Sequence, residues 1–288
     1  MLDLSPSHKP WNMEMTEMPK DSAAGTVDQD YATNAESGQI LSRRLQHVLT
    51  ADKDQLFTVV QDASGDVLQA ALRNPALDEQ HLLALLKRRG LGDIPAAIFS
   101  NKRLIESYAV KFALVRHPET PPHLVPAMLP LLYIFDLVKL CQMPGITADV
   151  HLAAERNIIQ RLPTQPLGNK LALARRGTAA VVESLLREGL PNVVEACLDN
   201  PHLKEGSLYQ FLSSAQATAE NVSTVARSSR WKGRPNIRLA ILKNPRTPAI
   251  WFTMFLPGLP AATLRDLLAS PRLTFAQKEL VRQASRHK

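Results

Sequence analysis

One repeated pattern constrains the fold of this chain more than any other feature. Residues 67–86 (VLQAALRNPALDEQHLLALL) and 193–212 (VVEACLDNPHLKEGSLYQFL) both fit V-x-x-A-x-L-x-N-P-x-L-x-E-x-x-L-x-x-x-L. Residues 237–256 and 110–129 keep most of this pattern. A unit of this length that recurs along a chain indicates an architecture built by stacking copies of the unit.

Each copy predicts a helix, a tight turn and a second helix. In the first copy Val67, Ala70 and Asn74 share one face of an α-helix. Pro75 ends that helix, because the residue before a proline is pushed out of the α region. Leu82 then begins a second apolar stripe. Over all copies, the prediction is helix at residues 67–73, 78–87, 194–199, 205–213, 236–243 and 248–255.

The asparagines of the Asn-Pro pairs are expected to be structural. Asparagine side chains readily hydrogen-bond the backbone of the turn in which they lie. We therefore expect Asn74, Asn200 and Asn244 to bond to turn backbone and to take no part in chemistry.

The prolines that mark the turns recur as two sets. The second set repeats the first at offsets of 126, 127 and 127 residues: Pro75, Pro118 and Pro144, then Pro201, Pro245 and Pro271. This spacing predicts an internal duplication in which residues 62–150 recur as 188–277. Residues 170–186 fit as one further, degenerate unit, with Gly177 at the place of the proline.

A helix pair of this kind cannot bury its apolar face alone, whereas stacked pairs bury a continuous core. The predicted fold class is therefore all-α: an α-solenoid of stacked helix pairs, internally duplicated. The L-x-x-N-P-x-T-P signature, present as LVRHPETPPHL and LKNPRTPAIW, resembles that of bacterial HEAT-like and leucine-rich repeat variant α-solenoid proteins. The resemblance covers about residues 60–280, and it implies a right-handed superhelical stack without specifying a function.

Some leucine-rich repeat variant proteins carry an iron–sulfur cluster on an N-terminal group of cysteines. This chain has only Cys141 and Cys197, so that feature is not carried over and no cofactor is expected. Two reduced thiols suit a cytoplasmic protein. The N-terminus has no apolar run behind a basic start, so no signal peptide is expected.

Four segments are expected along the chain: a disordered acidic tail (1–39), a first solenoid half with an N-terminal cap helix (40–150), a connecting helical unit (151–187) and a second solenoid half (188–288). Residues 1–40 hold seven acidic and two basic side chains, a net charge of −5, and little apolar periodicity. Two strongly apolar strips, 124–135 and 249–264, are interpreted as core helices. A strip that is partly exposed would instead be a partner site.

A basic cluster is the one group of residues whose composition suggests a binding function. No acidic residue lies between Glu220 and Asp266, and the cluster within that window carries an interleaved tryptophan. Basic side chains beside an aromatic ring suit a phosphate backbone with an unstacked base. The candidate partner- or nucleic-acid-binding residues are Arg227, Arg230, Trp231, Lys232, Arg234, Arg238, Lys243 and Arg246.

Catalytic and metal-binding patterns are not found in the sequence. The eight histidines are scattered, and His117 and His123 have no cysteine or carboxylate at ligand spacing. A glycosylase-like use of the basic cluster would need Asp136 or Asp266 to reach it from a neighbouring turn. We therefore expect a non-enzymatic interaction scaffold that binds a protein partner through its solenoid surface. The alternative is a nucleic-acid-binding solenoid that uses the basic cluster.

Overall fold

The structure is a computed structural model that describes residues 38–286, and this range contains helices and turns without any β-strand. The predicted acidic tail (1–39) lies almost wholly outside the described residues. The all-α prediction is confirmed. The chain divides into two compact units, Met1–Leu77 and Asp78–Lys288.

The first unit contains a helix over residues 38–50, followed by α2 (Lys53–Val59) and α3 (Gly65–Ala71). Asp52 starts α2 with a capping box: its side chain accepts from the Gln55 amide, and the Gln55 side chain accepts from the Asp52 amide. One core cluster of this unit is formed by Val48, Val67 and Ala71, with partly buried apolar side chains packed around them. Leu56 and Val60 are also fully buried.

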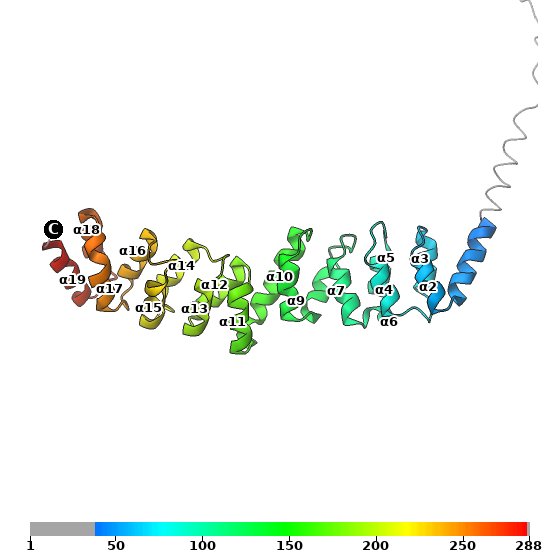
Figure 1. Ribbon diagram of the computed structural model, residues 1–288, viewed down its shortest axis with the longest axis horizontal. Coiled ribbons are helices and arrows are strands. Elements are labelled where there is room, and N and C mark those ends of the chain that lie inside the picture. Colours follow the sequence, from blue (N-terminus) through cyan, green and yellow to red (C-terminus); the bar gives the residue numbers. More distant parts are fainter. Residues whose placement is uncertain (1–37, 287–288) are drawn as a thin grey trace, which may run out of the picture. The chain divides into compact units, whose positions relative to one another are not determined.

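The second unit is a succession of short helices (Figure 1). The first group is α4 (Glu79–Leu85), α5 (Ile94–Ser100), α6 (Lys102–Ile105), α7 (Tyr108–Arg116), α8 (Val125–Met128), η1 (Leu129–Leu131), α9 (Ile134–Gln142), α10 (Ala148–Arg161) and η2 (Leu162–Thr164). The second group is α11 (Leu167–Arg176), α12 (Ala179–Glu188), α13 (Pro191–Leu198), α14 (Glu205–Leu212), α15 (Ala219–Arg227), α16 (Pro235–Lys243), α17 (Ala249–Phe255), η3 (Leu256–Gly258), α18 (Ala261–Ala269) and α19 (Phe275–Arg286).

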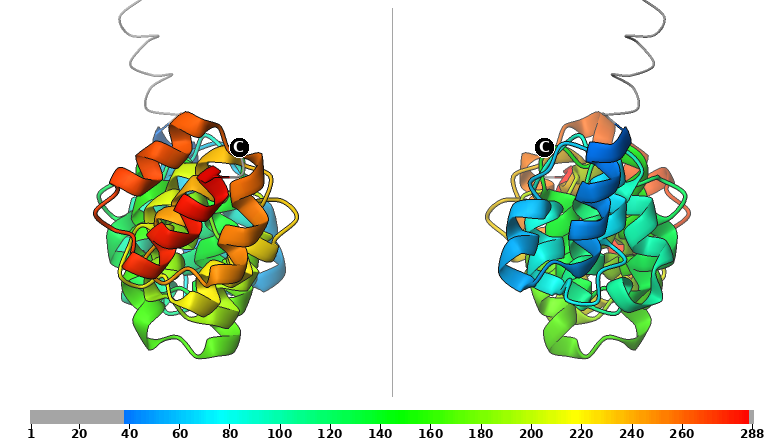
Figure 2. Two further views of the ribbon diagram at one scale, coloured as in Figure 1. Left: turned by 90° about the vertical axis from the view of Figure 1, so that its left-hand side faces the viewer. Right: turned by 90° about the vertical axis from the view of Figure 1, so that its right-hand side faces the viewer.

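Each helix in the second group contacts its neighbour in sequence, the helix two positions along the chain, or both. Helix α13 contacts α11, α12 and α15, and α14 contacts α12 and α16. Helix α19 lies against α17 and α18, as the end-on view in Figure 2 shows. The apolar stripes predicted from the repeat face these contacts: Val194, Cys197, Leu208 and Leu212 are buried. Among the described helices, none is both long enough and apolar enough to cross a membrane.

The predicted helices and turns of the repeat are confirmed, with ends that differ by up to three residues. Predicted helices 194–199 and 205–213 are found as α13 and α14. The three Asn-Pro pairs lie in turns between helices. Both strips of strongly apolar sequence contain a short helix that runs into a 3-10 turn at a proline: α8 into η1, and α17 into η3.

The repeat asparagines bond to turn backbone, as predicted, and they also reach further. Asn200 Oδ1 accepts from the His202 amide at 2.7 Å, within its own turn. Its Nδ2 donates to the carbonyl oxygens of Ala174 (2.8 Å) and Gly177 (3.1 Å), where α11 ends. Asn200 thus satisfies helix C-terminal carbonyls that have no partner inside their own helix.

The same hydrogen bonds recur in the other copies. Asn74 Nδ2 donates to the carbonyl oxygens of Val48 and Ala51, and Asn244 Nδ2 donates to that of Leu212. In the copy that has histidine before proline, His117 Nδ1 accepts from the Glu119 amide and Nε2 lies 2.8 Å from the Arg88 carbonyl oxygen. The His117 imidazole with its proton on Nε2 therefore makes the same two kinds of hydrogen bond as the asparagine side chain: it accepts within its own turn and donates to the carbonyl oxygen of an earlier segment.

Elements also recur at the spacing of the prolines. Helices α9 and α18 have equal lengths and start 127 residues apart, and α2 and α12 start 126 residues apart. Arg44 forms an ion pair with Asp62, and 126 residues later Lys170 forms one with Glu188. The recurrence therefore includes the helix over 38–50 and α2, whose counterparts are α11 and α12.

Candidate interaction surface

The predicted basic cluster lies on α15, α16 and the loops after them. Arg227 ends α15, Arg230 to Lys232 lie in the following loop, and Arg234 is the N-cap of α16. Arg238 and Lys243 lie on α16, and Arg246 lies in the turn after it. Of these eight residues, Trp231 is buried. Four arginines bond to other parts of the protein, and three of them are still exposed: Arg230, Arg234 and Arg246 are exposed and Arg238 is half-buried.

Trp231 is the clearest correction to the prediction. Its side chain was expected to be available for stacking on a base, but only 3% of the residue is exposed. The indole Nε1 donates to the Leu198 carbonyl oxygen at 3.0 Å, at the end of α13. Trp231 is therefore a core residue whose polar edge caps a helix, as is usual for a buried tryptophan.

Arg230 also bonds at the C-terminal end of α13. Its guanidinium lies 4.8 Å from the centre of the Trp231 ring, in a cation–π arrangement. Its Nη1 donates to the Asn200 carbonyl oxygen at 2.7 Å. A cation at the carbonyl end of a helix also interacts favourably with the helix dipole. Arg230 is thus committed to the turn between α13 and α14.

Three further arginines of the basic cluster make internal bonds. Arg234 pairs with Glu205 of α14 at 3.3 Å. Arg238 Nε donates to the Lys232 carbonyl oxygen at 2.6 Å, and its guanidinium lies over the Phe255 ring. Arg246 Nη1 donates to the Ala215 carbonyl oxygen. Much of the positive charge counted along the sequence is therefore already paired with carbonyl or carboxylate oxygens.

Acidic side chains from earlier helices also lie against the basic cluster. Glu195 and Asp199 line a small polar pocket of about 240 Å³ together with Arg227 and Thr224. The 220–266 window has no acid of its own, but the fold brings carboxylates to it from α13 and α14. Of the remaining basic side chains, Lys232 is exposed and Lys243 is half-buried. The surface here is mixed in charge.

The apolar strip at 124–135 is only partly a core helix. Val125, Met128, Leu129 and Leu132 are buried, as predicted. Leu131 and Tyr133, however, are 58% and 66% exposed, and Phe135 is 36% exposed. Exposed apolar patches mark interaction sites, whereas single exposed apolar side chains are normal on a protein surface. This strip therefore meets the condition stated for a partner site.

The half-buried Tyr108 holds the exposed Tyr133 in place. The Tyr108 and Tyr133 rings pack with centroids 4.5 Å apart. Tyr108 Oη donates to Asp136 at 2.6 Å and accepts from the Tyr133 amide at 3.0 Å. Tyr133 is thus fixed at its ring and at its backbone while its outer face meets solvent. We name the surface of Leu131, Tyr133 and Phe135 the aromatic strip.

The pKa values of the two ionisable groups in this network, Tyr108 and Asp136, are shifted in opposite directions. Desolvation, followed by the hydrogen bond to Asp136, raises the pKa of Tyr108 to about 12. Hydrogen bonds from Lys139 and then Tyr108 hold the pKa of Asp136 below its ordinary value. Asp136 therefore stays ionised at neutral pH and keeps its bond to the tyrosine. This carboxylate supports Tyr133 and is not directed to the basic cluster.

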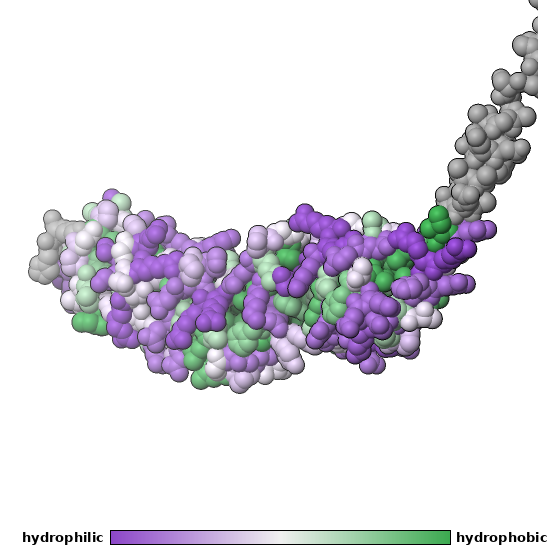
Figure 3. All heavy atoms as spheres, turned by 45° about the vertical axis from the view of Figure 1, so that its right-hand side comes forward, coloured by the Kyte–Doolittle hydropathy of each residue, from purple (hydrophilic) through white to green (hydrophobic). Residues whose placement is uncertain are grey.

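The corresponding strip at 249–264 is also two-sided. Trp251, Phe252 and Phe255 of α17 are buried, and Trp251 Nε1 donates to Ser223 Oγ at 3.0 Å. Ile250 and Met254, one helical turn apart, are 58% and 60% exposed. On the face displayed in Figure 3, hydrophobic side chains reach the surface in several patches separated by hydrophilic ones.

Metal-ligating and reactive groups are sparse in the described range. Between residues 38 and 286, no group of three or more His, Cys, Asp or Glu side chains is placed to hold a metal ion. Cys141 and Cys197 are free thiols, and burial raises the pKa of each to about 12. Neither thiol is therefore activated as a nucleophile.

Comparisons with protein-family models, with curated proteins and with solved structures find no match. The features described above define an all-helical protein whose helices pack in pairs. Its surface carries fixed, exposed apolar and aromatic side chains.

Proposed function

We propose that this protein is a non-enzymatic interaction scaffold: an internally duplicated α-solenoid that binds a protein partner. The packing of helices against helices one or two positions along the chain supports a solenoid. The recurrence of helices, asparagine bonds and ion pairs at 126–127 residues supports it as well. The two copies under this proposal run from residue 38 to α10 and from α11 to α19.

The aromatic strip carries the proposal. An exposed aromatic side chain that is already ordered loses little conformational entropy on binding, and aromatic anchors dominate the energetics of protein interfaces. Tyr133 is 66% exposed yet held by Tyr108 and, through it, by Asp136. The hydrogen bond from Arg161 to the Leu132 carbonyl oxygen, at 2.7 Å, fixes the same backbone from α10. Such a site favours a partner with a complementary apolar pocket.

Nucleic-acid binding through the basic cluster remains the second candidate. Lys232 and Arg227 are exposed and carry the charge that this function needs. It is the weaker candidate because Trp231 is buried and because Arg230, Arg234, Arg238 and Arg246 already bond to protein oxygens.

The test begins with a photo-crosslinking amino acid at position 133 of the full chain, in cells that express it. The protein that it captures is then purified, and its affinity is measured for the parent, for Tyr133→Ala and for a control. Tyr209→Ala is a matched control, because Tyr209 of α14 is also an exposed tyrosine, at 38%.

The expected result is a loss of roughly 30-fold in affinity for Tyr133→Ala, which is what truncating an interface anchor worth about 2 kcal/mol causes. Tyr209→Ala should bind as the parent does. Equal affinity of Tyr133→Ala and the parent would reject the aromatic strip as the binding site.

A further inference from the structure

The two copies of the duplication differ at the first helix pair of each copy. The pair is α11 and α12 in the later copy, and the helix over 38–50 and α2 in the earlier one. The difference is in what covers the side of the pair that faces the preceding segment of the chain. In the later copy, α10 packs against α12. In this copy Leu173 of α11 and Val181 and Leu185 of α12 have no exposed surface. The residues 126 positions earlier are His47, Gln55 and Val59, on the helix over 38–50 and on α2.

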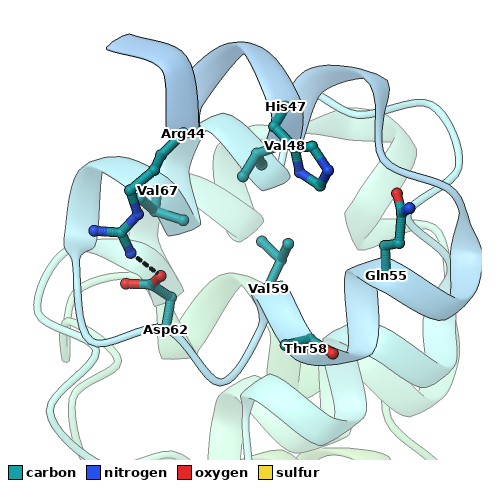
Figure 4. A pocket seen from close by; sticks show the side chains of 8 residues that line it. All are labelled: Arg44, His47, Val48, Gln55, Thr58, Val59, Asp62 and Val67. Atoms are coloured by element: carbon teal, nitrogen blue, oxygen red, sulfur yellow. Dashed lines mark hydrogen bonds and ion pairs between the residues drawn. The ribbon is translucent and has the colours of Figure 1, made fainter. Parts of the chain in front are cut away.

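In the earlier copy the described residues leave this surface exposed. His47 and Gln55 are exposed and Val59 is half-buried. A cavity of about 360 Å³ lies between the helix over 38–50 and α2. Figure 4 shows Val48 and Val59 pointing into it from opposite sides, with the Arg44–Asp62 ion pair at one edge. An apolar floor with a polar rim is thus present where the later copy holds a helix.

The segment directly before the helix over 38–50 has a sequence pattern like that of α10. In α10 the buried residues include Val150, Ala154 and Ile158. The residues 127 positions earlier are Ala23, Val27 and Tyr31, which keep the same spacing of apolar side chains. The same offset relates α10 to α19, whose Gln277 and Val281 are buried.

The chain connects the segment and the cavity directly, because the segment leads into the helix that forms one wall of the cavity. Residues 21–35 contain Asp21, Asp28 and Asp30 and no lysine or arginine. The polar rim of the cavity is mixed in charge, because Arg44 is paired with Asp62 there. The apolar pattern of the segment and its position in the chain, rather than charge, therefore select it as the occupant.

We propose that residues 21–35 bind in this cavity as a helix, with Val27 and Tyr31 on Val48 and Val59. The segment then covers the first helix pair as α10 covers α12. Under this proposal, residues 21–35 of the predicted acidic tail cap the first helix pair of the fold. This inference is independent of the aromatic strip, which lies on η1 and α9.

Disulfide trapping in the full chain tests the proposal. Tyr31→Cys is combined with Thr58→Cys, because Thr58 lines the cavity and is exposed. The control replaces Gln29 instead of Tyr31, since residue 29 lies on the opposite side of a helix that places residue 31 in the cavity. The native thiols do not compete, because burial raises the pKa of Cys141 and Cys197 to about 12.

The expected result is rapid formation of an intramolecular disulfide in the 31/58 variant and at least tenfold slower formation in the 29/58 variant. Equal rates in the two variants, or no disulfide in either, would overturn the proposal. A disulfide between two chains in the 31/58 variant would also overturn it and would assign the cavity to a second copy. In uncrosslinked protein, Tyr31→Asp should increase amide hydrogen exchange at residues 55–60, whereas Gln29→Asp should not; unchanged exchange in Tyr31→Asp would likewise count against the cap.

Discussion

The side chain of Asn200 donates a hydrogen bond to the carbonyl oxygen of Ala174 at 2.8 Å, across 26 residues of sequence. Asn74 makes the same bond to Val48, also across 26 residues. The asparagine of the repeat motif therefore forms a turn and also links its helix pair to the preceding one by a hydrogen bond. The asparagine before each proline is selected by two requirements: an acceptor for its own turn and a donor for the preceding helix end.

Replacing this asparagine should destabilise the protein by more than the loss of a cap. Asn200→Ala leaves the His202 amide without its acceptor and two buried carbonyl oxygens without a donor. We expect a loss of about 1–3 kcal/mol in the free energy of unfolding. Chemical denaturation measures it, with Asn236→Ala, which removes an exposed bond to Glu205, as the control. Equal stability of Asn200→Ala and the parent would show that this tie contributes nothing.

Glu119 should make stability depend on pH in the acidic range. Its carboxylate accepts from the amides of Gly90, Leu91 and Gly92 at 2.6, 2.6 and 3.0 Å. The amide of Gly90 contributes most to holding the pKa of Glu119 below 4.5. Because the folded-state pKa is depressed, this stabilisation is present above about pH 4.5 and is lost as pH falls through the lower, folded-state value.

The variant that tests this is Glu119→Gln. At pH 7 it should melt below the parent, and the difference should shrink as pH falls below about 4.5. Thermal unfolding from pH 3 to pH 7 measures both proteins, and Glu106→Gln serves as the control for an acid elsewhere on this part of the chain. A difference between parent and Glu119→Gln that stays constant over this range would contradict the assignment.

Gly177 is required by a close approach and not by its backbone angles. A Cβ at this position would lie 2.6 Å from the Leu173 carbonyl oxygen and 2.8 Å from Val181 Cγ1. Gly177→Ala should therefore lower the free energy of unfolding by about 1–3 kcal/mol, the usual cost of overpacking a core. The residue 126 positions earlier is Ala51, which tolerates its methyl group. Ala51→Gly is the matched control and should cost less; equal losses would contradict the steric argument.

The helices and turns of the repeat could be predicted because their causes are local. Pro75 and Pro201 stop a helix wherever they lie, and a 3.6-residue stripe of leucine and valine identifies the helix before them. The partners of Asn200 could not be predicted, because they lie 23 and 26 residues away on a helix whose position depends on packing.

The internal bonds of the basic cluster could not be predicted for a related reason. A charge count along the sequence does not see the Leu198 and Ala215 carbonyl oxygens, nor Glu205, which packing brings to these arginines. The sequence shows only that Glu79 and Glu205 hold the same place in the repeat. In the structure both accept at that place, from Ser107 and from Arg234. The role of Tyr133 carried no comparable signal, because its exposure depends on Tyr108 and Asp136 in three dimensions.

The basic cluster gives the last prediction, which separates structural arginines from those free to bind a polyanion. Arg230→Glu should lower the melting temperature, because a carboxylate would replace a donor at the Asn200 carbonyl oxygen. Trp231→Ala should cost about 3–5 kcal/mol, because it empties a buried site. Neither variant can therefore report on nucleic-acid binding by itself.

The informative variant is Lys232→Glu, since Lys232 is exposed and its substitution should leave the melting temperature unchanged. If this surface contacts the phosphates of duplex DNA, the dependence of log affinity on log salt should flatten by about 0.9 for each contact that the substitution removes. Fluorescence anisotropy with a DNA duplex at several salt concentrations measures this slope. A slope equal to that of the parent, or absence of binding by the parent near 50 mM salt, would reject nucleic-acid binding here and leave the aromatic strip as the site to pursue.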